Sequence, residues 1–246
     1  MESQIKEGGR RRDLEKSLSK KIGRAIADYG MIKDGDRILV AVSGGKDSLT
    51  LLKLLSERKK FVPIRYDILA LHVDLGYRCV NKDVLKKFLE DNGYSYHFKK
   101  LDILKGKRRK DITCFWCSWN RRKALFEAAQ AYGCRTIALG HHKDDIAQTI
   151  LMNLLFEGEI SAMAPRQELF GGKLTLIRPL AYVDERDIQE LARLYRFPLP
   201  HCACPNAGKT KRAVVGKFID ELEKETPSVK TNILRSLQRI KKDYLL

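Results

Sequence analysis

One short segment of the chain combines residue types that suit chemistry on a phosphorylated substrate. Residues 43–48 read Ser-Gly-Gly-Lys-Asp-Ser, between an apolar run that predicts a buried strand over 37–42 and a helical pattern continuing to Leu55. A glycine-rich turn between strand and helix presents backbone N–H groups and the positive end of the helix dipole to phosphate oxygens. The segment therefore predicts a phosphate-binding loop with hydroxyl, ammonium and carboxylate groups, and the carboxylate could hold Mg²⁺ or a ribose. Its candidate ligand-binding residues are Ser43, Gly44, Gly45, Lys46, Asp47 and Ser48.

Two better-known nucleotide-binding motifs do not account for this segment. The only Gly-Lys-Thr lies at residues 208–210, where Ala203 replaces the required earlier glycine and no predicted strand leads into the turn. Residues 43–48 also do not match Gly-x-Gly-x-x-Gly. The sequence therefore excludes a Walker-type NTPase and gives no support to a dinucleotide-binding oxidoreductase.

Two further polar segments follow predicted strands. Residues 71–76, Leu-His-Val-Asp-Leu-Gly, end a strand over 66–73, and residues 140–145, Gly-His-His-Lys-Asp-Asp, end a strand over 136–140. In open α/β sheets, ligands bind outside the carboxyl ends of the strands, so these segments are expected to face the same crevice as the phosphate loop.

The six cysteines suggest a second kind of chemistry. Cys79 and Cys134 stand alone and suit buried structural positions, whereas the other four form two close pairs. The first pair, Cys-x-x-Cys, precedes a helical pattern over 124–132, and the second, Cys-x-Cys, lies far downstream. Such pairs could bind zinc, hold an iron–sulfur cluster or act as a redox pair. The pairs are Cys114 with Cys117 and Cys202 with Cys204.

The elements around these motifs alternate between buried strands and amphipathic helices. This alternation predicts an α/β fold with a doubly wound parallel sheet. A helix over 14–29 is expected to follow a mobile basic arm at residues 1–12, and the tail predicts two helices separated near Pro227. We therefore expect a basic arm and lead helix at 1–33, an α/β domain at 34–200 and a helical C-terminal extension at 201–246. The remaining predicted elements are strands at 95–101 and 174–178 and helices at 82–92 and 187–195.

The composition points to a polyanionic partner. The 246 residues include 48 Lys and Arg against 31 Asp and Glu, a net charge of +17, which favours nucleic acid because neutralised phosphates release counterions. With 43% hydrophobic residues the chain is neither disordered nor fibrous. The sequence contains no stretch suited to a membrane span or signal peptide, so we expect a cytoplasmic protein.

Taken together, these motifs resemble a known family. Ser-Gly-Gly-x-Asp-Ser after the first strand is the signature of PP-loop ATP pyrophosphatases, which have a HUP-type Rossmann-like fold. The Cys-x-x-Cys-x-x-x-Arg-Arg and Gly-His-His-x-Asp-Asp segments narrow the resemblance to tRNA 2-thiocytidine synthetases. The resemblance implies ATP with Mg²⁺, tRNA as acceptor, and a [4Fe–4S] cluster held by three cysteines. It also implies a sulfur donor, either a cysteine desulfurase or inorganic sulfide, and it leaves a homodimer open.

The resemblance also assigns roles to individual residues. Cys114 and Cys117 match the first two cluster ligands, and Cys204 is favoured over Cys202 as the third, with a four-thiolate zinc site as the alternative. Arg121 matches a position that stabilises charge, and Asp144 matches a catalytic aspartate. The segments containing His72 and Gly140 match the strand ends that bind the nucleotide.

Three other functions remain in competition at this point. A PP-loop ligase of the lysidine synthetase kind would not need the paired cysteines. A tRNA 2-thiouridine synthetase would usually carry additional zinc-ribbon cysteines at its termini, which are missing from this sequence. A non-catalytic RNA-binding protein with structural zinc would use the basic charge and the cysteines but not the phosphate loop.

Overall fold

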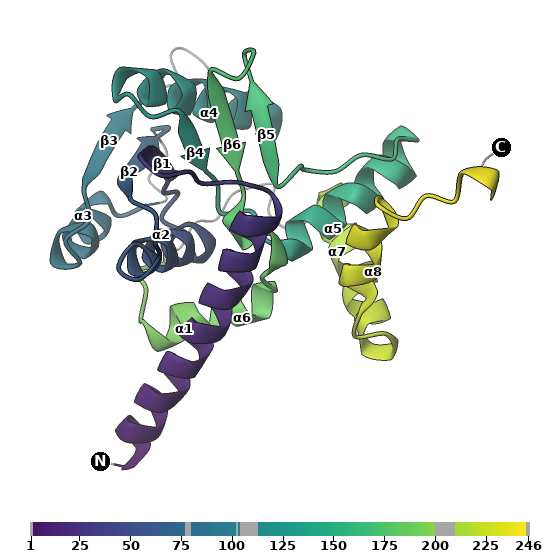
Figure 1. Cartoon of the computed structure of the whole chain (residues 1–246), viewed down its shortest axis with the longest axis horizontal. Helices are drawn as coiled ribbons and strands as arrows, with labels where there is room; N and C mark the ends of the chain where they lie inside the picture. Colours follow the sequence, from purple (N-terminus) through teal and green to yellow (C-terminus); the bar gives the residue numbers. More distant parts are fainter. Residues whose placement is uncertain (1, 77–79, 102, 104–112, 200–209, 245–246) are drawn as a thin grey trace.

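The computed structural model describes residues 2–76, 80–101, 103, 113–199 and 210–244. Its centre is a six-stranded sheet in the order β3-β2-β1-β4-β6-β5, in which all neighbours are parallel except β5 and β6 (Figure 1). The predicted α/β class is therefore confirmed. The strands are β1 (Asp36–Ala41), β2 (Tyr66–Asp74), β3 (Tyr96–Lys100), β4 (Thr136–Ala138), β5 (Arg166–Leu169) and β6 (Leu174–Ile177).

Helices cover both faces of this sheet. The apolar side chains of α1, α2, α3 and α6 form one buried cluster with Ile38 and Val40 of β1. The opposite face of β1, through Leu39, packs with α4 in a second cluster. This alternation in β1 gives the two-layered core expected for strands buried on both sides. The α-helices are α1 (Glu2–Asp28), α2 (Lys46–Arg58), α3 (Lys82–Asp91), α4 (Cys114–Ala131), α5 (Lys143–Met152), α6 (Glu185–Leu194), α7 (Lys211–Glu225) and α8 (Val229–Ser236). Shorter helices are η2 (Asn153–Glu157), η3 (Pro179–Tyr182) and η4 (Lys242–Tyr244).

The strand order reverses its direction between β1 and β4, where a crevice is expected. From β1 the chain adds β2 and then β3 on one side, whereas β4, β6 and β5 lie on the other side. The register pairs Val40 of β1 with both Ala70 of β2 and Ala138 of β4, so the carboxyl ends of the three strands lie together. At such a reversal of strand order the following loops diverge and leave room for a ligand.

Three local predictions from the sequence are wrong. The N-terminal helix begins at Glu2, so residues 10–12 lie within it and are not a mobile arm. Helix α4 begins at Cys114 itself, so the Cys-x-x-Cys forms its first turn and does not precede it. Strand β5 was not predicted, because its sequence, Arg-Gln-Glu-Leu, lacks the apolar pattern of a buried strand; it is an antiparallel edge strand.

The two ends of the chain add helices outside the sheet. Leu18, Ile22 and Ala25 of α1 are fully buried, whereas the N-terminal part of this helix projects away from the body (Figure 1). The pair α7 and α8 packs on α5 through Val215 and Ile219. Among the described helices, none has the length and apolar character needed to cross a bilayer.

Candidate active site at the carboxyl edge of the sheet

The phosphate loop has a closed internal hydrogen-bond network. Ser48 is buried and its hydroxyl donates to the Gly45 carbonyl at 2.9 Å while accepting from the Ser43 amide at 3.1 Å. The Ser43 hydroxyl lies 3.2 Å from the Ser48 hydroxyl and accepts from the Gly45 amide at 3.3 Å. The two serines thus hold the loop in a fixed shape at the start of α2, where its dipole favours an anion.

Glycine is required at two positions around this loop. Gly44 has φ +88°, a conformation that side chains rarely adopt. A Cβ on Gly140 would lie 3.1 Å from both the Asp47 carbonyl carbon and the Ser48 amide nitrogen. The segment after β4 therefore approaches the N-terminus of α2 more closely than any other residue would allow, which brings the two predicted segments together.

Lys46 is held by carboxylates on the loop and on α6. Its Nζ lies 2.8 Å from Glu185 Oε1 and 3.1 Å from Asp47 Oδ1. Burial alone would lower the pKa of Lys46, but the hydrogen bond and charge of Glu185 and the charge of Asp47 raise it. Within the described part of the chain, Asp47 Oδ1 is buried and accepts no hydrogen bond of good geometry, so it retains a lone pair for a cation.

Asp144 is buried at the start of α5 and is held by groups from three other elements. Its Oδ1 lies 2.5 Å from Lys230 Nζ on α8, and its Oδ2 accepts from the Glu185 amide at 2.8 Å. The Nδ1 atom of His142 is 3.5 Å from Oδ2. Burial would raise the pKa of Asp144, but His142, Lys230 and the amide together hold it well below its usual range. Asp144 is therefore an ionised, oriented carboxylate.

The C-terminal helices contact both aspartates of the Gly-His-His-Lys-Asp-Asp segment. Lys230 on α8 is itself buried and also pairs with Glu223 on α7 at 2.8 Å. Arg212, at the start of α7, lies 3.2 Å from Asp145 Oδ1. The C-terminal extension thus supplies two cations to the edge of the crevice.

His72 has a structural side chain. It is buried, its Nδ1 lies 2.8 Å from the Val42 carbonyl, and its ring packs against Phe98 with centroids 5.3 Å apart. Because a carbonyl only accepts, the ring nitrogen donates, and burial lowers the pKa of His72. The side chain therefore supports the backbone just before the phosphate loop.

The first turn of α4 carries the cysteine motif. The Thr113 hydroxyl caps this helix by accepting from the Trp116 amide at 3.1 Å. Cys117 is half-buried, and Arg121 follows one turn later with an exposed side chain. Although the Arg121 side chain as a whole is exposed, partial desolvation of its guanidinium lowers its pKa, and the charge of Cys117 opposes that shift. The charge of Arg121 also contributes to lowering the pKa of His72. The side chain of Cys114, and all of Cys79, Cys202 and Cys204, lie outside what the structure describes.

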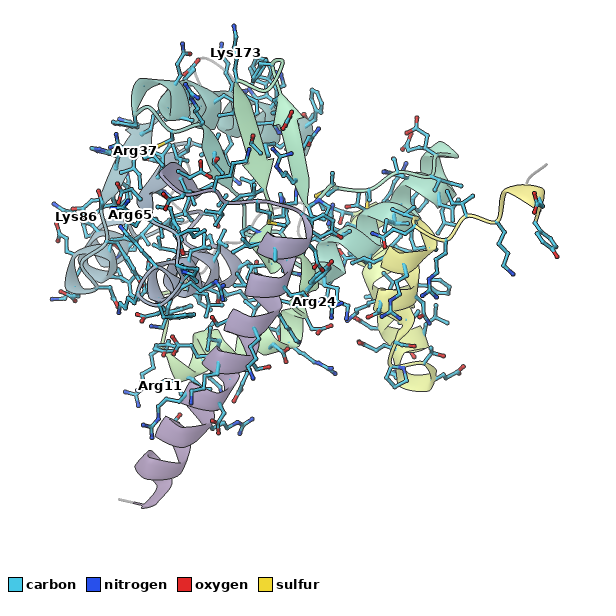
Figure 2. All side chains as sticks on the ribbon, viewed as in Figure 1. Arg11, Arg24, Arg37, Arg65, Lys86 and Lys173 are labelled. Atoms are coloured by element: carbon cyan, nitrogen blue, oxygen red, sulfur yellow. The ribbon has the colours of Figure 1, made fainter. Side chains whose placement is uncertain are left out.

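The basic side chains that could contact nucleic acid lie in different surroundings. On α1, Arg10 pairs with Glu190 at 3.0 Å, and the Arg11 guanidinium lies 5.0 Å from the ring centre of Tyr195. Figure 2 shows Arg11 and Arg24 along this helix and Lys173 on the turn between β5 and β6, so basic side chains spread over several elements. The cluster at 105–110 and Lys209 lie outside the described residues.

Sequence reasoning missed three residues that the structure brings to the site. Glu185, Lys230 and Arg178 come from α6, α8 and the end of β6, far from the recognisable motifs. Only Arg178 carried a signal, because it ends a predicted strand as the other site residues do. The partners of Lys46 and Asp144 depend on how distant helices pack, which local patterns do not specify.

Comparison with known proteins agrees with this geometry. Residues 14–199 match the PP-loop domain family. A sulfurtransferase-like solved structure, the U34-tRNA thiolase NcsA from Methanococcus maripaludis with its [4Fe-4S] cluster, superposes with a TM-score of 0.77 at 28% identity, covering 93% of this chain and 79% of that one. The chain is thus a PP-loop protein with an ATP-type phosphate loop at the carboxyl edge of its sheet.

Closer relatives define the family within that class. The tRNA-cytidine(32) 2-sulfurtransferase of Geobacter sulfurreducens is 44% identical over 94% of this chain and 92% of its own length. The protein of the same name from Pseudomonas syringae is 37% identical over 94% of this chain and 86% of its own. The chain belongs to the tRNA-cytidine(32) 2-sulfurtransferase family, and it is an enzyme.

Proposed function

We propose that this enzyme uses ATP to activate the C2 oxygen of a tRNA cytidine, at position 32 as in its named relatives, and replaces that oxygen with sulfur. The observation that carries the proposal is that Cys117, in the first turn of α4, packs on the same core cluster as Ala41 and Leu139 at the carboxyl ends of β1 and β4. On α4, Cys117 and Arg121 lie one helical turn apart, and Arg121 acts electrostatically on His72 beside the loop. Activation and sulfur delivery can therefore take place on the same base.

ATP binding begins with the preformed loop. The amides at the start of α2 bind phosphate oxygens, and the Ser43–Ser48 hydrogen bonds keep those amides pointing outward. Lys46 supplies a positive charge whose position Glu185 sets. Asp47 and Asp144 are the carboxylates that would hold Mg²⁺, since one buried oxygen of Asp47 has no hydrogen bond within the described residues. The strand end at His72 is the expected adenine contact.

The reaction has two steps in which charge changes near the C2 atom of the base: activation of its oxygen and departure of AMP. When the C2 oxygen of the base attacks the α-phosphate, pyrophosphate leaves and the oxygen becomes part of an AMP leaving group. Asp144 stays ionised because its pKa is held well below the usual range, and it orients the attacking base. Arg121 stabilises negative charge on the departing AMP when sulfur takes its place at C2. Both residues are proposed as catalytic.

The donor set on α4 suits a [4Fe–4S] cluster. Two cysteines share the first helical turn, and the charge of Cys117 partly offsets the lowering of the Arg121 pKa that desolvation causes. Cys114, Cys117 and Cys204 would hold the cluster, leaving one iron to carry sulfur; zinc is the alternative metal for the same thiolates. Bound there, the cluster supplies the sulfur that is transferred.

Partners follow from the same chemistry. A target base in a tRNA loop must be turned out of its stack, so phosphate contacts from basic side chains are expected to hold the loop. The sulfur donor is a cysteine desulfurase or inorganic sulfide. A homodimer, formed through the C-terminal helices, is the expected assembly, and the cytoplasm is the expected location.

The test is nucleoside mass spectrometry of tRNA. Anaerobically purified protein is incubated with tRNA, ATP, Mg²⁺ and sulfide, with an otherwise identical sample lacking ATP. We expect a cytidine that has exchanged oxygen for sulfur, only with ATP. Sulfur in a uridine would move the enzyme to the 2-thiouridine branch. Unmodified tRNA, from protein with an intact cluster, would contradict thiolation and favour the lysidine synthetase kind of ligase.

A further inference from the structure

Arg178 is a buried cation for which the described part of the chain provides no anion. It follows β6, and only 6% of its surface is exposed. Its guanidinium donates to the Ala164 carbonyl through one terminal nitrogen and to His141 Nδ1 through Nε at 3.3 Å. Both acceptors are uncharged, and no described carboxylate lies within ion-pair distance. A buried charge without a counter-ion is costly, so this arrangement is stabilised when an anion binds.

The neighbours of Arg178 add positive charge and a hydrogen-bond donor. Burial lowers the pKa of Arg178 to about 10, and the charge of Arg122, exposed on α4, adds to that shift. Burial and the nearby cations hold the pKa of His141 at about 4, so its ring is neutral near pH 7. Since Nδ1 of this neutral ring accepts from Arg178, Nε2 carries the proton and is a donor.

The position of Arg178 places this group beside the phosphate loop. Strand β6 pairs with β4, and β4 pairs with β1, so the strand ends follow one another along one edge of the sheet. That edge carries the end of β2 with His72, the phosphate loop after β1, His141 after β4 and Arg178 after β6. Arg178 therefore lies across the loop from the strand end expected to contact adenine.

We propose that Arg178, with the His141 imidazole beside it and Arg122 of α4 contributing positive charge, forms a phosphate-binding subsite of the active site. The guanidinium planes suit tetrahedral phosphate oxygens, and the imidazole N–H adds a neutral donor. Two substrates could supply the phosphate: ATP through the part that leaves as pyrophosphate, or tRNA through its backbone beside the target base. The phosphate site is argued from the structure alone, whereas naming ATP and tRNA as the two sources rests on the proposed function.

The test measures binding without turnover, using full-length protein with its cluster in place. Arg178→Met, Arg178→Lys and Arg122→Met are compared with Arg37→Met, which removes an exposed arginine from β1 at the opposite edge of the sheet (labelled in Figure 2). One arm measures the Kd of inorganic pyrophosphate by calorimetry. The other measures the Kd of unmodified tRNA at several salt concentrations. Thermal unfolding shows which variants fold.

We expect Arg178→Met and Arg122→Met to raise the Kd of one of the two ligands by about tenfold or more. This is the size of effect expected for the loss of a charge-assisted hydrogen bond. Weaker pyrophosphate binding identifies ATP as the source. Weaker tRNA binding identifies the tRNA backbone as the source. In that case the slope of log Kd against log salt concentration should fall by the equivalent of about one phosphate contact. Arg178→Lys keeps the charge but loses the paired geometry, so we expect a smaller effect.

The proposal of a phosphate subsite would be overturned if folded Arg122→Met and Arg178→Lys both bound pyrophosphate and tRNA with Kd values within about twofold of the wild type. That pair decides the question even if Arg178→Met does not fold. Failure of thiolation would appear separately, as unmodified tRNA in mass spectrometry, because neither binding arm requires sulfur transfer.

Discussion

The two walls of the crevice are built in different ways. On the phosphate-loop wall, hydrogen bonds fix the loop, and Lys46 and Asp144 are paired with groups from α6 and α8. On the α4 wall, the first turns carry large exposed aromatic side chains, with Phe115 75% and Trp119 46% exposed. The ATP wall is thus organised by the packed chain itself. We expect the α4 wall to depend on what binds there, namely a cluster and RNA.

The substitution with the largest expected effect separates the two walls. Cys117→Ala removes a proposed cluster ligand, so we expect thiolation to fall by more than about a thousandfold, because sulfur delivery is lost while the phosphate loop is untouched. ATP affinity should stay within about twofold. Nucleoside mass spectrometry measures the first quantity and calorimetry with ATP the second.

Cys134→Ala is the matched control for this substitution. Cys134 is buried in the core formed with α4 and the sheet, so its loss should cost stability but leave thiolation in place. Sulfur transfer that survives Cys117→Ala would show that Cys117 is not needed for sulfur delivery and would assign the paired cysteines a structural role.

On the ATP wall, the largest expected stability effect is at Lys230. Lys230→Met leaves the buried carboxylate of Asp144 and the half-buried carboxylate of Glu223 without their shared cation. We expect the free energy of unfolding to fall by about 2–4 kcal/mol, because an unpaired buried charge is costly. Urea unfolding measures this change. Lys224→Met, which breaks an exposed pair with Glu221, should change stability by less than about 0.5 kcal/mol. Equal effects of the two substitutions would show that α8 does not stabilise Asp144.

A smaller effect is expected where the two sides of the loop touch. Gly140→Ala places a Cβ 3.1 Å from backbone atoms of Asp47 and Ser48, which cannot move without disturbing the start of α2. We expect stability to fall by about 1–3 kcal/mol and ATP affinity to fall with it. Calorimetry and thermal unfolding measure both. Gly9→Ala, in open space on α1, should be neutral or slightly stabilising. Unchanged ATP binding in Gly140→Ala would show that this contact does not shape the loop.

The sequence predicted what is local and missed what depends on packing. Residues 43–48 could be read directly, since a strand, two glycines and a helix start determine where the amides point. The parallel strands followed from their apolar runs. The strand β5 could not be read, because an edge strand needs no apolar pattern. Glu185 and Lys230 could not be assigned to the site either, since their contacts depend on how α6 and α8 pack against α5.

A pH-dependent effect on stability, similar in size to that of Gly140→Ala, tests the neutral imidazole beside Arg178. Burial first, and then the charges of Arg178, Arg212 and His142, lower the pKa of His141 to about 4, against about 6.5 in an unfolded chain. The neutral ring is thus favoured in the folded state, so its contribution to stability is complete above about pH 6.5 and is lost as the pH falls toward 4. In His141→Gln, an amide that does not titrate in this range replaces the ring. Urea unfolding between pH 7 and 4.5 should show the wild type losing about 2 kcal/mol more than the variant. Parallel losses in the two proteins would mean that His141 is protonated as easily in the folded chain as in the unfolded one, and that the cations around Arg178 do not act on it.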